Sequence, residues 1–254
     1  LPAVAARTCE LDCFDTIEGL AIRGGPHLSI LTGISLHGGL SAVWPERRVT
    51  AVTTVQALMQ HWQTWGMPGY AQFDNDNRFT GPKQHADAIG RVIRLCLSLN
   101  VTPVFSVPNE TGFQASIESF NGRWQTKVWN RFEHLRLRDL KQRSKRYIAA
   151  LCDRHAARRE SAPARAAIPE EWRLNLQSRP RGIIVFLRRT NGRGAVEILG
   201  HAFDVDRNWP HRLVRSEVDL DRHAIRFYAL RRRAPQEQPL LNQVHYELPN
   251  RAFK

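Results

Sequence analysis

Residues 112–129 show the clearest separation of apolar and polar positions in the chain. Read as a helix, this segment places large apolar side chains on one face at spacings of three, four and four: Ile117, Phe120, Trp124 and Val128. That spacing is typical of an amphipathic helix packed on a core. A second face is polar around one carboxylate and carries Gln114, Glu118, Asn121 and Gln125. The third face is basic and carries Arg123, Lys127 and Arg131.

Before this helix, apolar runs predict strands at 9–17, 27–36 and 40–44. A Gly-Gly-Pro turn joins the first two strands, and Pro45 is expected to end the third. Apolar positions at helical spacing then alternate with short apolar runs. They predict helices at 53–65, 84–99 and 137–159, and strands at 70–73 and 101–107. This order predicts an α/β fold with a mixed-sheet core and flanking helices.

The pattern of apolar and polar residues changes from residue 182 onward, where short apolar runs are separated by turn residues. This pattern predicts a small all-β, barrel-like C-terminal domain. The expected organisation is a core at 1–172, a linker at 173–181 and a basic β domain at 182–254. A chain of 254 residues is long enough for one sizeable core and a small second domain.

The charge of the chain favours a polyanionic partner. The sequence holds 37 Lys and Arg against 24 Asp and Glu, for a net charge of +13. Residues 123–159 alone contain 12 Lys or Arg and three Asp or Glu. A solvated helix face is the simple explanation of such a run, and nucleic-acid binding is the functional one.

Other features bound the setting of the chain. No apolar run approaches 18 residues, so no membrane span is expected. The four Cys show no CxxC pair and predict reduced thiols in a cytoplasm. The sequence begins without Met and without a signal pattern, so we expect a piece of a longer protein.

Three carboxylates occupy positions suited to a cation site. Asp12 lies within the first strand, Asp74 follows the strand at 70–73, and Glu118 projects from the helix at 112–129. Oxygen ligands from separate elements suit hard divalent cations such as Mg²⁺. Two such ions roughly 3.5–4 Å apart can stabilise both the attacking and the leaving oxygen of a phosphoryl transfer.

The segments around these carboxylates resemble those of a known family. ELDCFDTI resembles the first strand of the retroviral-integrase superfamily, which includes transposases and integrases of bacterial insertion sequences, and places its first Asp at Asp12. FDNDNRF resembles the strand-end motif DNG-x-x-F and places the second Asp at Asp74. GFQASIESFN resembles the segment with the catalytic Glu, which falls on Glu118, with Asn121 following. The resemblance covers about residues 7–172.

The resemblance implies a ribonuclease H-like core and a Mg²⁺- or Mn²⁺-dependent polynucleotidyl transferase, with two ions held by Asp12, Asp74 and Glu118. Water would cut at the end of a mobile element, and the exposed 3′-OH would then attack target DNA. Asn121, Arg123, Lys127 and Arg131 would contact DNA. The implied partners are double-stranded DNA, as element ends and target, and further copies of the chain. The implied location is the bacterial cytoplasm, with the nucleoid.

Two positions leave the site assignment open. Asp76 stands where the family has Gly, so it is an extra ligand, the true second acid, or a mark of a decayed copy. Asp15 rivals Asp12, because residues three apart on a strand point to opposite faces. The alternative functions are a DNA-binding remnant without catalysis and a two-metal ribonuclease H-like nuclease that does not join DNA.

Overall fold

The computed structural model describes residues 1–82, 84–110, 112–231 and 234–250. Internal contacts divide the chain into two units. The described part of the first unit includes residues 3–72 and 112–168. The second includes residues 73–110 and the described residues from 169 onward.

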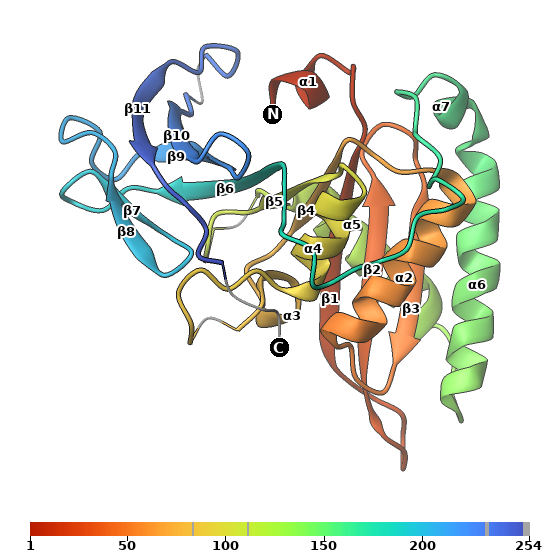
Figure 1. Ribbon diagram of the computed structural model, residues 1–254. Helices are drawn as coiled ribbons and strands as arrows, with labels where there is room; N and C mark the ends of the chain where they lie inside the picture. Colours follow the sequence, from red (N-terminus) through yellow and green to blue (C-terminus); the bar gives the residue numbers. More distant parts are fainter. Residues whose placement is uncertain (83, 111, 232–233, 251–254) are drawn as a thin grey trace. The chain divides into compact units, whose positions relative to one another are not determined.

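The first unit is built on a mixed sheet. Strands β1 (Leu11–Ala21), β2 (His27–Ser35) and β3 (Ser41–Glu46) form an antiparallel meander, and β4 (Tyr70–Phe73) pairs parallel to β1 (Figure 1). The predicted α/β class and the three antiparallel strands are confirmed. Strand β3 continues through Pro45, where we expected it to end, because it pairs only with β2 among the strands of this unit and an edge strand tolerates proline.

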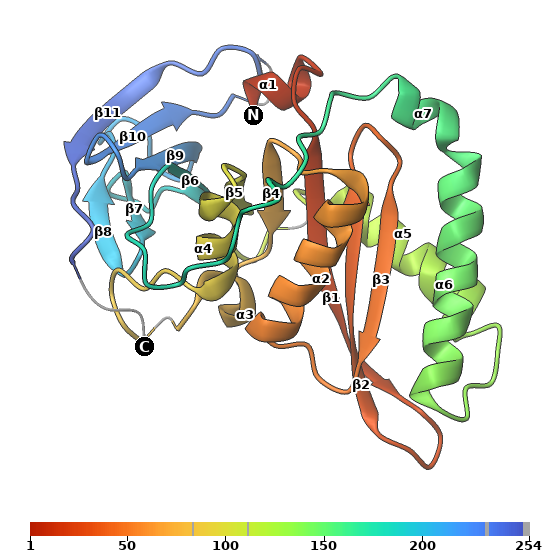
Figure 2. The same cartoon turned by 45° about the vertical axis from the view of Figure 1, so that its right-hand side comes forward.

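Helices cover both faces of this sheet (Figure 2). Helix α2 (Ala51–Trp65) packs on one face, where Trp62 contacts the ring of Phe14 on β1. Helix α5 (Ala115–Trp124) packs on the other face and continues as one π-helical turn, η1 (Gln125–Trp129). The predicted apolar stripe of this helix is confirmed, since its four members are at most 1% exposed: Ile117, Phe120, Trp124 and Val128.

The remaining helices of the first unit follow in the chain. Helix α6 (Leu137–Arg154) packs Leu140 into the same apolar cluster as Trp124 and Val128. It ends earlier than predicted, and a short α7 (Ala156–Glu160) follows. At the N-terminus, α1 (Pro2–Ala5) is a short helix that the sequence did not indicate.

Among the described residues of the second unit, five strands pair side by side in one sheet. Strand β5 (Thr102–Phe105) is parallel to β6 (Ile183–Arg189), and β9 (Leu213–Asp219), β10 (Ala224–Ala229) and β11 (Leu240–His245) continue from β6 in antiparallel order. The predicted all-β character of the C-terminal part is confirmed. The barrel-like shape is wrong for the residues described, because β11 pairs with β10 alone and the sheet stays open. Residues 251–254 of the predicted domain lie outside the described residues.

Smaller elements complete the second unit. Strands β7 (Ala195–Ile198) and β8 (His201–Asp204) form a separate hairpin. The helix predicted at 84–99 is shorter, since α4 (Arg91–Ser98) begins after Gly90. A four-residue helix, α3 (Asn77–Thr80), precedes it.

Two further expectations concern the whole chain. All four cysteines are free, as expected for reduced thiols. In the described ranges, no helix combines the length and apolar character that crossing a membrane requires.

Candidate functional site

The two faces of β1 carry different aspartates. Leu11 and Cys13 lie in an apolar cluster with Ile117 of α5, so the odd-numbered side chains of β1 face that helix. Phe14 contacts the rings of His61 and Trp62 of α2, so the even-numbered side chains face the opposite way. Asp12 therefore points toward α2, and Asp15 points toward α5.

Asp12 is fully buried and strongly bound within the protein. Its Oδ1 accepts a hydrogen bond from Nη1 of Arg165 at 2.9 Å, and its Oδ2 accepts one from Nη2 of the same residue at 2.6 Å. The indole Nε1 of Trp62 donates a third bond to Oδ2 at 3.1 Å. A two-pronged Arg–carboxylate pair of this kind is among the strongest charge-assisted contacts in proteins.

Asp15 is half-buried and connects to the helix that carries Glu118. Its Oδ2 accepts a hydrogen bond of 2.8 Å from the side-chain amide of Asn121, and its Oδ1 accepts one of 2.7 Å from the Thr16 backbone N–H. Glu118 is exposed and precedes Asn121 by three residues, so the two are neighbours on the helix surface. The structure thus joins Asp15 to Asn121, three residues after Glu118 on the helix, and it places Asp12 on the other face of the strand.

The second unit shows the local setting of Asp74. This residue follows directly after β4, and its Oδ1 accepts a 2.8 Å hydrogen bond from the backbone N–H of Asp76. Asp76 is the N-cap of α3, where its Oδ1 accepts from the backbone N–H of Arg78 at 2.8 Å. Its carboxylate also pairs with the guanidinium of Arg78 at 2.8 Å. The negative charge of Asp76 therefore stabilises the start of α3 and the pair with Arg78.

Asn75, between these two acids, is held by its surroundings in the second unit. Its side-chain amide donates to the backbone oxygen of Ser106 at 2.7 Å and accepts from Nη2 of Arg188 at 2.9 Å. Burial lowers the pKa of Arg188 to about 10, and the nearby charge of Glu197 partly opposes that shift. The guanidinium remains charged at neutral pH and fixes the Asn75 side chain.

The predicted cation ligands do not fit together as a site. No group of three or more His, Cys, Asp or Glu side chains in the described part of the chain is arranged to hold a metal ion. Asp12 fails on its own chemistry as well, because both of its oxygens already accept bonds from a guanidinium. A cation at that carboxylate would meet the positive charge of Arg165.

A basic groove runs along the first unit between η1 and α6. Its volume is about 860 Å³, and six cationic side chains line it: Arg123, Lys127, Arg131, Arg143, Arg146 and Arg154. No described carboxylate forms an ion pair with any of them. Three of these residues were predicted DNA contacts on the basic face of the helix. The structure adds the α6 residues to the same groove.

Sequence reasoning missed Arg165 and Trp62 as partners of Asp12. Trp62 was assigned to the core from its helical spacing, and it is fully buried as expected. Its indole N–H, however, donates a hydrogen bond to Asp12, which the spacing of apolar residues along the helix does not indicate. Arg165 lies in an irregular segment rich in Ala, Pro and Arg, where no periodic pattern could mark a single residue.

Comparisons with known proteins show a likeness in fold only. No family model matches the chain, and no curated protein matches it. Among solved structures, the catalytic core domain of BIV integrase is 15% identical, with a TM-score of 0.38, over 58% of this chain and 80% of that one. The HTLV-2 integrase catalytic core domain in complex with magnesium is 14% identical, with a TM-score of 0.41, over 56% and 82%.

A larger assembly matches more of the chain. The simian T-cell lymphotropic virus intasome, in complex with the PP2A regulatory subunit B56 gamma, is 12% identical, with a TM-score of 0.48, over 96% of this chain and 78% of that one. These retroviral integrase structures resemble the chain at low identity.

Proposed function

We propose that this chain is a DNA integrase or transposase that binds double-stranded DNA and transfers a DNA end to a target strand. The observation that carries the proposal is the basic groove of the first unit, which lies on the helix that also bears Glu118. Six cations that pair with no carboxylate among the described residues repel one another, and a polyanion in the groove would relieve that repulsion. The phosphate backbone of DNA supplies regularly spaced negative charge for this purpose.

In this proposal the groove holds DNA by its backbone. Arg123, Lys127 and Arg131 contact phosphates from the α5–η1 side, and Arg143, Arg146 and Arg154 contact them from α6. Contacts of this type position a duplex without reading its sequence. Asn121 stays a proposed contact beside the DNA, although its amide nitrogen is already bonded to Asp15.

The chemical step in the proposal is a transesterification. A DNA 3′-OH attacks a target phosphodiester, a new P–O bond forms, and the target strand's 3′ oxygen leaves. Divalent cations, Mg²⁺ or Mn²⁺, would supply charge neutralisation for this chemistry. The predicted ligand set of Asp12, Asp74 and Glu118 does not fit as it stands, because Asp12 is bonded to Arg165.

The proposed function also implies an oligomeric state and a location in the cell. Joining two element ends calls for more than one copy of the chain, so a homo-oligomer on DNA is part of it. A bacterial cytoplasmic location with the nucleoid is also part of it. Asp74 is the proposed acid of the DNDN segment, supported by the use of Asp76 as a helix cap.

A DNA-binding protein without catalysis is the second candidate function. The observation in its favour is the commitment of Asp12 to an internal ion pair, since this removes one predicted catalytic acid. A nuclease of similar fold that does not join strands has no separate observation in its favour.

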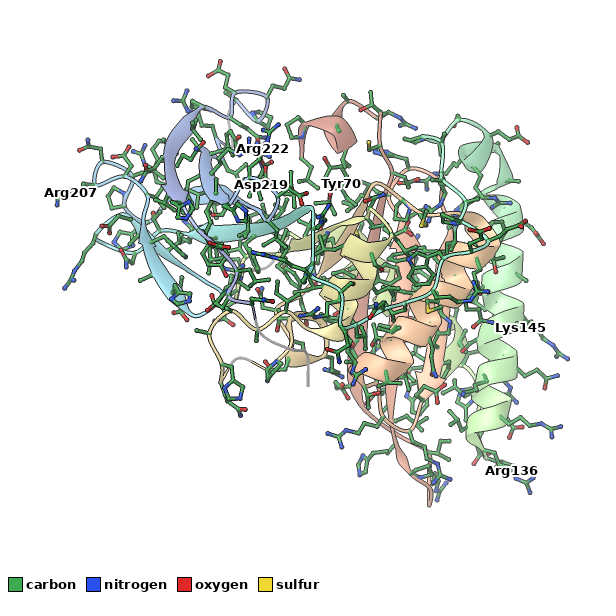
Figure 3. All side chains as sticks on the ribbon, in the orientation of Figure 1. Tyr70, Arg136, Lys145, Arg207, Asp219 and Arg222 are labelled. Atoms are coloured by element: carbon green, nitrogen blue, oxygen red, sulfur yellow. The ribbon has the colours of Figure 1, made fainter. Side chains whose placement is uncertain are left out.

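DNA binding is tested first, with two substitutions on the same helix. Arg146→Gln removes a cation that lines the groove, whereas Lys145→Gln removes the neighbouring cation, which does not line it. Both side chains are exposed, and Figure 3 shows Lys145 extending away from α6. Fluorescence anisotropy of a short labelled duplex, measured over a range of KCl concentrations, gives the affinity and its salt dependence.

Arg146→Gln is expected to weaken binding and to reduce the slope of log K against log salt by about 1. Lys145→Gln is expected to leave the slope near that of the wild type. Equal effects of the two substitutions on DNA affinity would show that DNA binding depends on the net charge of the chain and not on the groove.

A further inference from the structure

We infer that the basic groove of the first unit takes unpaired nucleotides of a DNA strand, with Phe132 and Arg143 as the surface on which a base stacks. This inference rests on the proposed function, in which the same groove holds DNA by its phosphates. It adds which kind of DNA the groove selects.

The groove has an apolar lining that phosphate contacts do not use. Besides the six cations, Val128 of η1 and Phe132 just after it line one side, and Tyr147 and Leu151 of α6 line the other. Phosphates bind to cations and hydrogen-bond donors, so a duplex held by its backbone alone leaves these side chains without a ligand. The lining therefore indicates a ligand that carries apolar faces as well as negative charge.

Phe132 is the exposed aromatic side chain of this lining. It is 43% exposed, whereas Val128 and Leu151 are at most 8% exposed. The guanidinium carbon of Arg143 lies 4.5 Å from the centre of the Phe132 ring, and that of Arg131 lies 5.7 Å from it. Aromatic rings and guanidinium planes both stack on unpaired bases, while neighbouring cations bind the phosphates. The surroundings of Phe132 thus combine the two kinds of contact that a single strand needs.

The segment that carries Phe132 is held in place by its neighbours. The ring of Trp129 stacks on the ring of His134, with centroids 5.3 Å apart. His134 is buried, and its Nε2 shares a 3.1 Å hydrogen bond with a backbone oxygen of η1. Nη1 of Arg143 donates to the backbone oxygen of Glu133 at 3.0 Å. A surface that is already ordered loses little conformational entropy when a ligand binds to it.

A second hollow of about 400 Å³ adjoins the groove, because Arg123, Leu151 and His155 line both. Hydroxyl and guanidinium groups, which donate hydrogen bonds to phosphates and base edges, line it further along: Ser116, Ser119 and Arg158. The two hollows therefore form one path from η1 and α6 toward the start of α5. A flexible single strand can follow such a path over several nucleotides.

These features distinguish an unpaired strand from a duplex. In a duplex, neighbouring base pairs cover the faces of each base, so the duplex offers the groove its phosphates and no face for stacking. An unpaired nucleotide offers both, and its stacking on an aromatic side chain adds affinity without reading the sequence. RNA shares this chemistry, and DNA is the inferred ligand because the proposed function acts on DNA.

Four labelled ligands test the inference by fluorescence anisotropy. The first is a blunt duplex, and the second is the same duplex with a short unpaired 3′ extension of thymidines. The third carries the same extension built from abasic sugars, which keeps the phosphates and removes the bases. The fourth carries it as RNA. Because the second and third ligands have equal charge, the difference between their affinities isolates the contribution of the bases.

The matched substitutions are Phe132→Ala, which removes the ring, and Leu135→Ala. Leu135 is 74% exposed in the same segment and does not line the groove, so it serves as the control. The wild type is expected to bind the thymidine extension about tenfold more tightly than the abasic one. Phe132→Ala should lose this preference and keep the affinity of the wild type for the blunt duplex. Leu135→Ala should keep both.

Two further variants separate the ring from simple packing. Phe132→Leu keeps an apolar side chain without a ring and is expected to lose the preference for thymidines, as Phe132→Ala does. Phe132→Tyr keeps the ring and is expected to retain the preference. Loss of the preference in Phe132→Tyr, or its full retention in Phe132→Leu, would contradict stacking on the ring.

The outcomes separate this inference from the proposed function. Equal affinity of the wild type for the thymidine and abasic extensions overturns the inference, and a duplex affinity that still depends on Arg146 leaves the proposed function standing. A thymidine preference that survives Phe132→Ala also overturns the inference. Tighter binding of the RNA extension overturns the assignment to DNA. A wild type that prefers thymidines through Phe132 but joins no DNA refutes the proposed function and leaves the inference in place. A wild type that binds none of the ligands refutes both.

Discussion

Stability should depend on pH through His61, which lies beside the Asp12–Arg165 pair. His61 is buried in α2, its Nε2 is 3.8 Å from Oδ2 of Asp12, and that nitrogen has no hydrogen-bond partner among the described residues. The rings of Phe14 and Trp44 contact it edge-on. Burial lowers the pKa of His61 from 6.5 to about 4. The Asp12 charge opposes this shift, and the Arg165 charge adds to it.

The direction of the effect follows from the two protonation states. Below pH 6.5 the unfolded chain takes up a proton at His61, while the folded chain stays neutral there until about pH 4. Folding therefore has its full stability above pH 6.5 and loses it progressively as the pH falls toward 4. A pKa difference of this size corresponds to roughly 3 kcal/mol over the whole window, and to roughly 2.5 kcal/mol between about pH 7.5 and about pH 4.5.

Urea unfolding of the wild type and of His61→Phe across that pH range measures the effect. Other acids titrate in both proteins, so the difference between the two stability curves isolates His61. We expect the wild type to lose roughly 2.5 kcal/mol more than the variant on acidification. Parallel curves would refute the buried, neutral state of His61 and with it the packing described around Asp12.

Three further predictions concern local contacts, each measured by the urea midpoint. Thr50→Ala removes the side chain that caps α2 by a 3.2 Å bond from the Thr53 N–H, and should cost about 1 kcal/mol. Asp76→Ala removes both the cap of α3 and the pair with Arg78, and should cost about 1–2 kcal/mol, whereas no loss would show that Asp76 is not structural. Ser144→Ala leaves the buried indole N–H of Trp124 without its 3.2 Å partner and should cost about 1–3 kcal/mol, less if Trp124 is already changed to Phe.

The parts of the fold that sequence predicted are those with local physical causes. The apolar stripe from Ile117 to Val128 is buried because its spacing follows the helix period over several turns. Helix α2 begins after Thr50, which forms a capping box with Thr53. The π-helical turn η1 was not predicted, since it keeps Val128 buried and changes only the backbone bonding.

The choice between Asp12 and Asp15 could not be made from the sequence. Strand alternation correctly places them on opposite faces, but the neighbours Leu11, Cys13 and Phe14 are apolar on both faces. Which face meets α5 depends on packing between distant segments. Arg165, which pairs with Asp12, is 153 positions away from it in the chain.

Closure of the C-terminal sheet depends on distant segments too. The short apolar runs that predict strands after residue 182 are local features, and β6, β9 and β10 lie within them, whereas β11 was not predicted. Whether the last strand returns to pair with the first is set by strand twist and long-range register, which short apolar runs do not encode.

Joining of DNA is the most direct test of the central claim. The chain is incubated with a labelled duplex that carries a free 3′-OH and with a target plasmid, with Mg²⁺ or Mn²⁺ or with EDTA, and joined products are resolved on a denaturing gel. The proposed function predicts labelled strands attached to the target only when a divalent cation is present. DNA bound in the groove with no joined product under any cation would contradict polynucleotidyl transfer and favour a DNA-binding protein without catalysis.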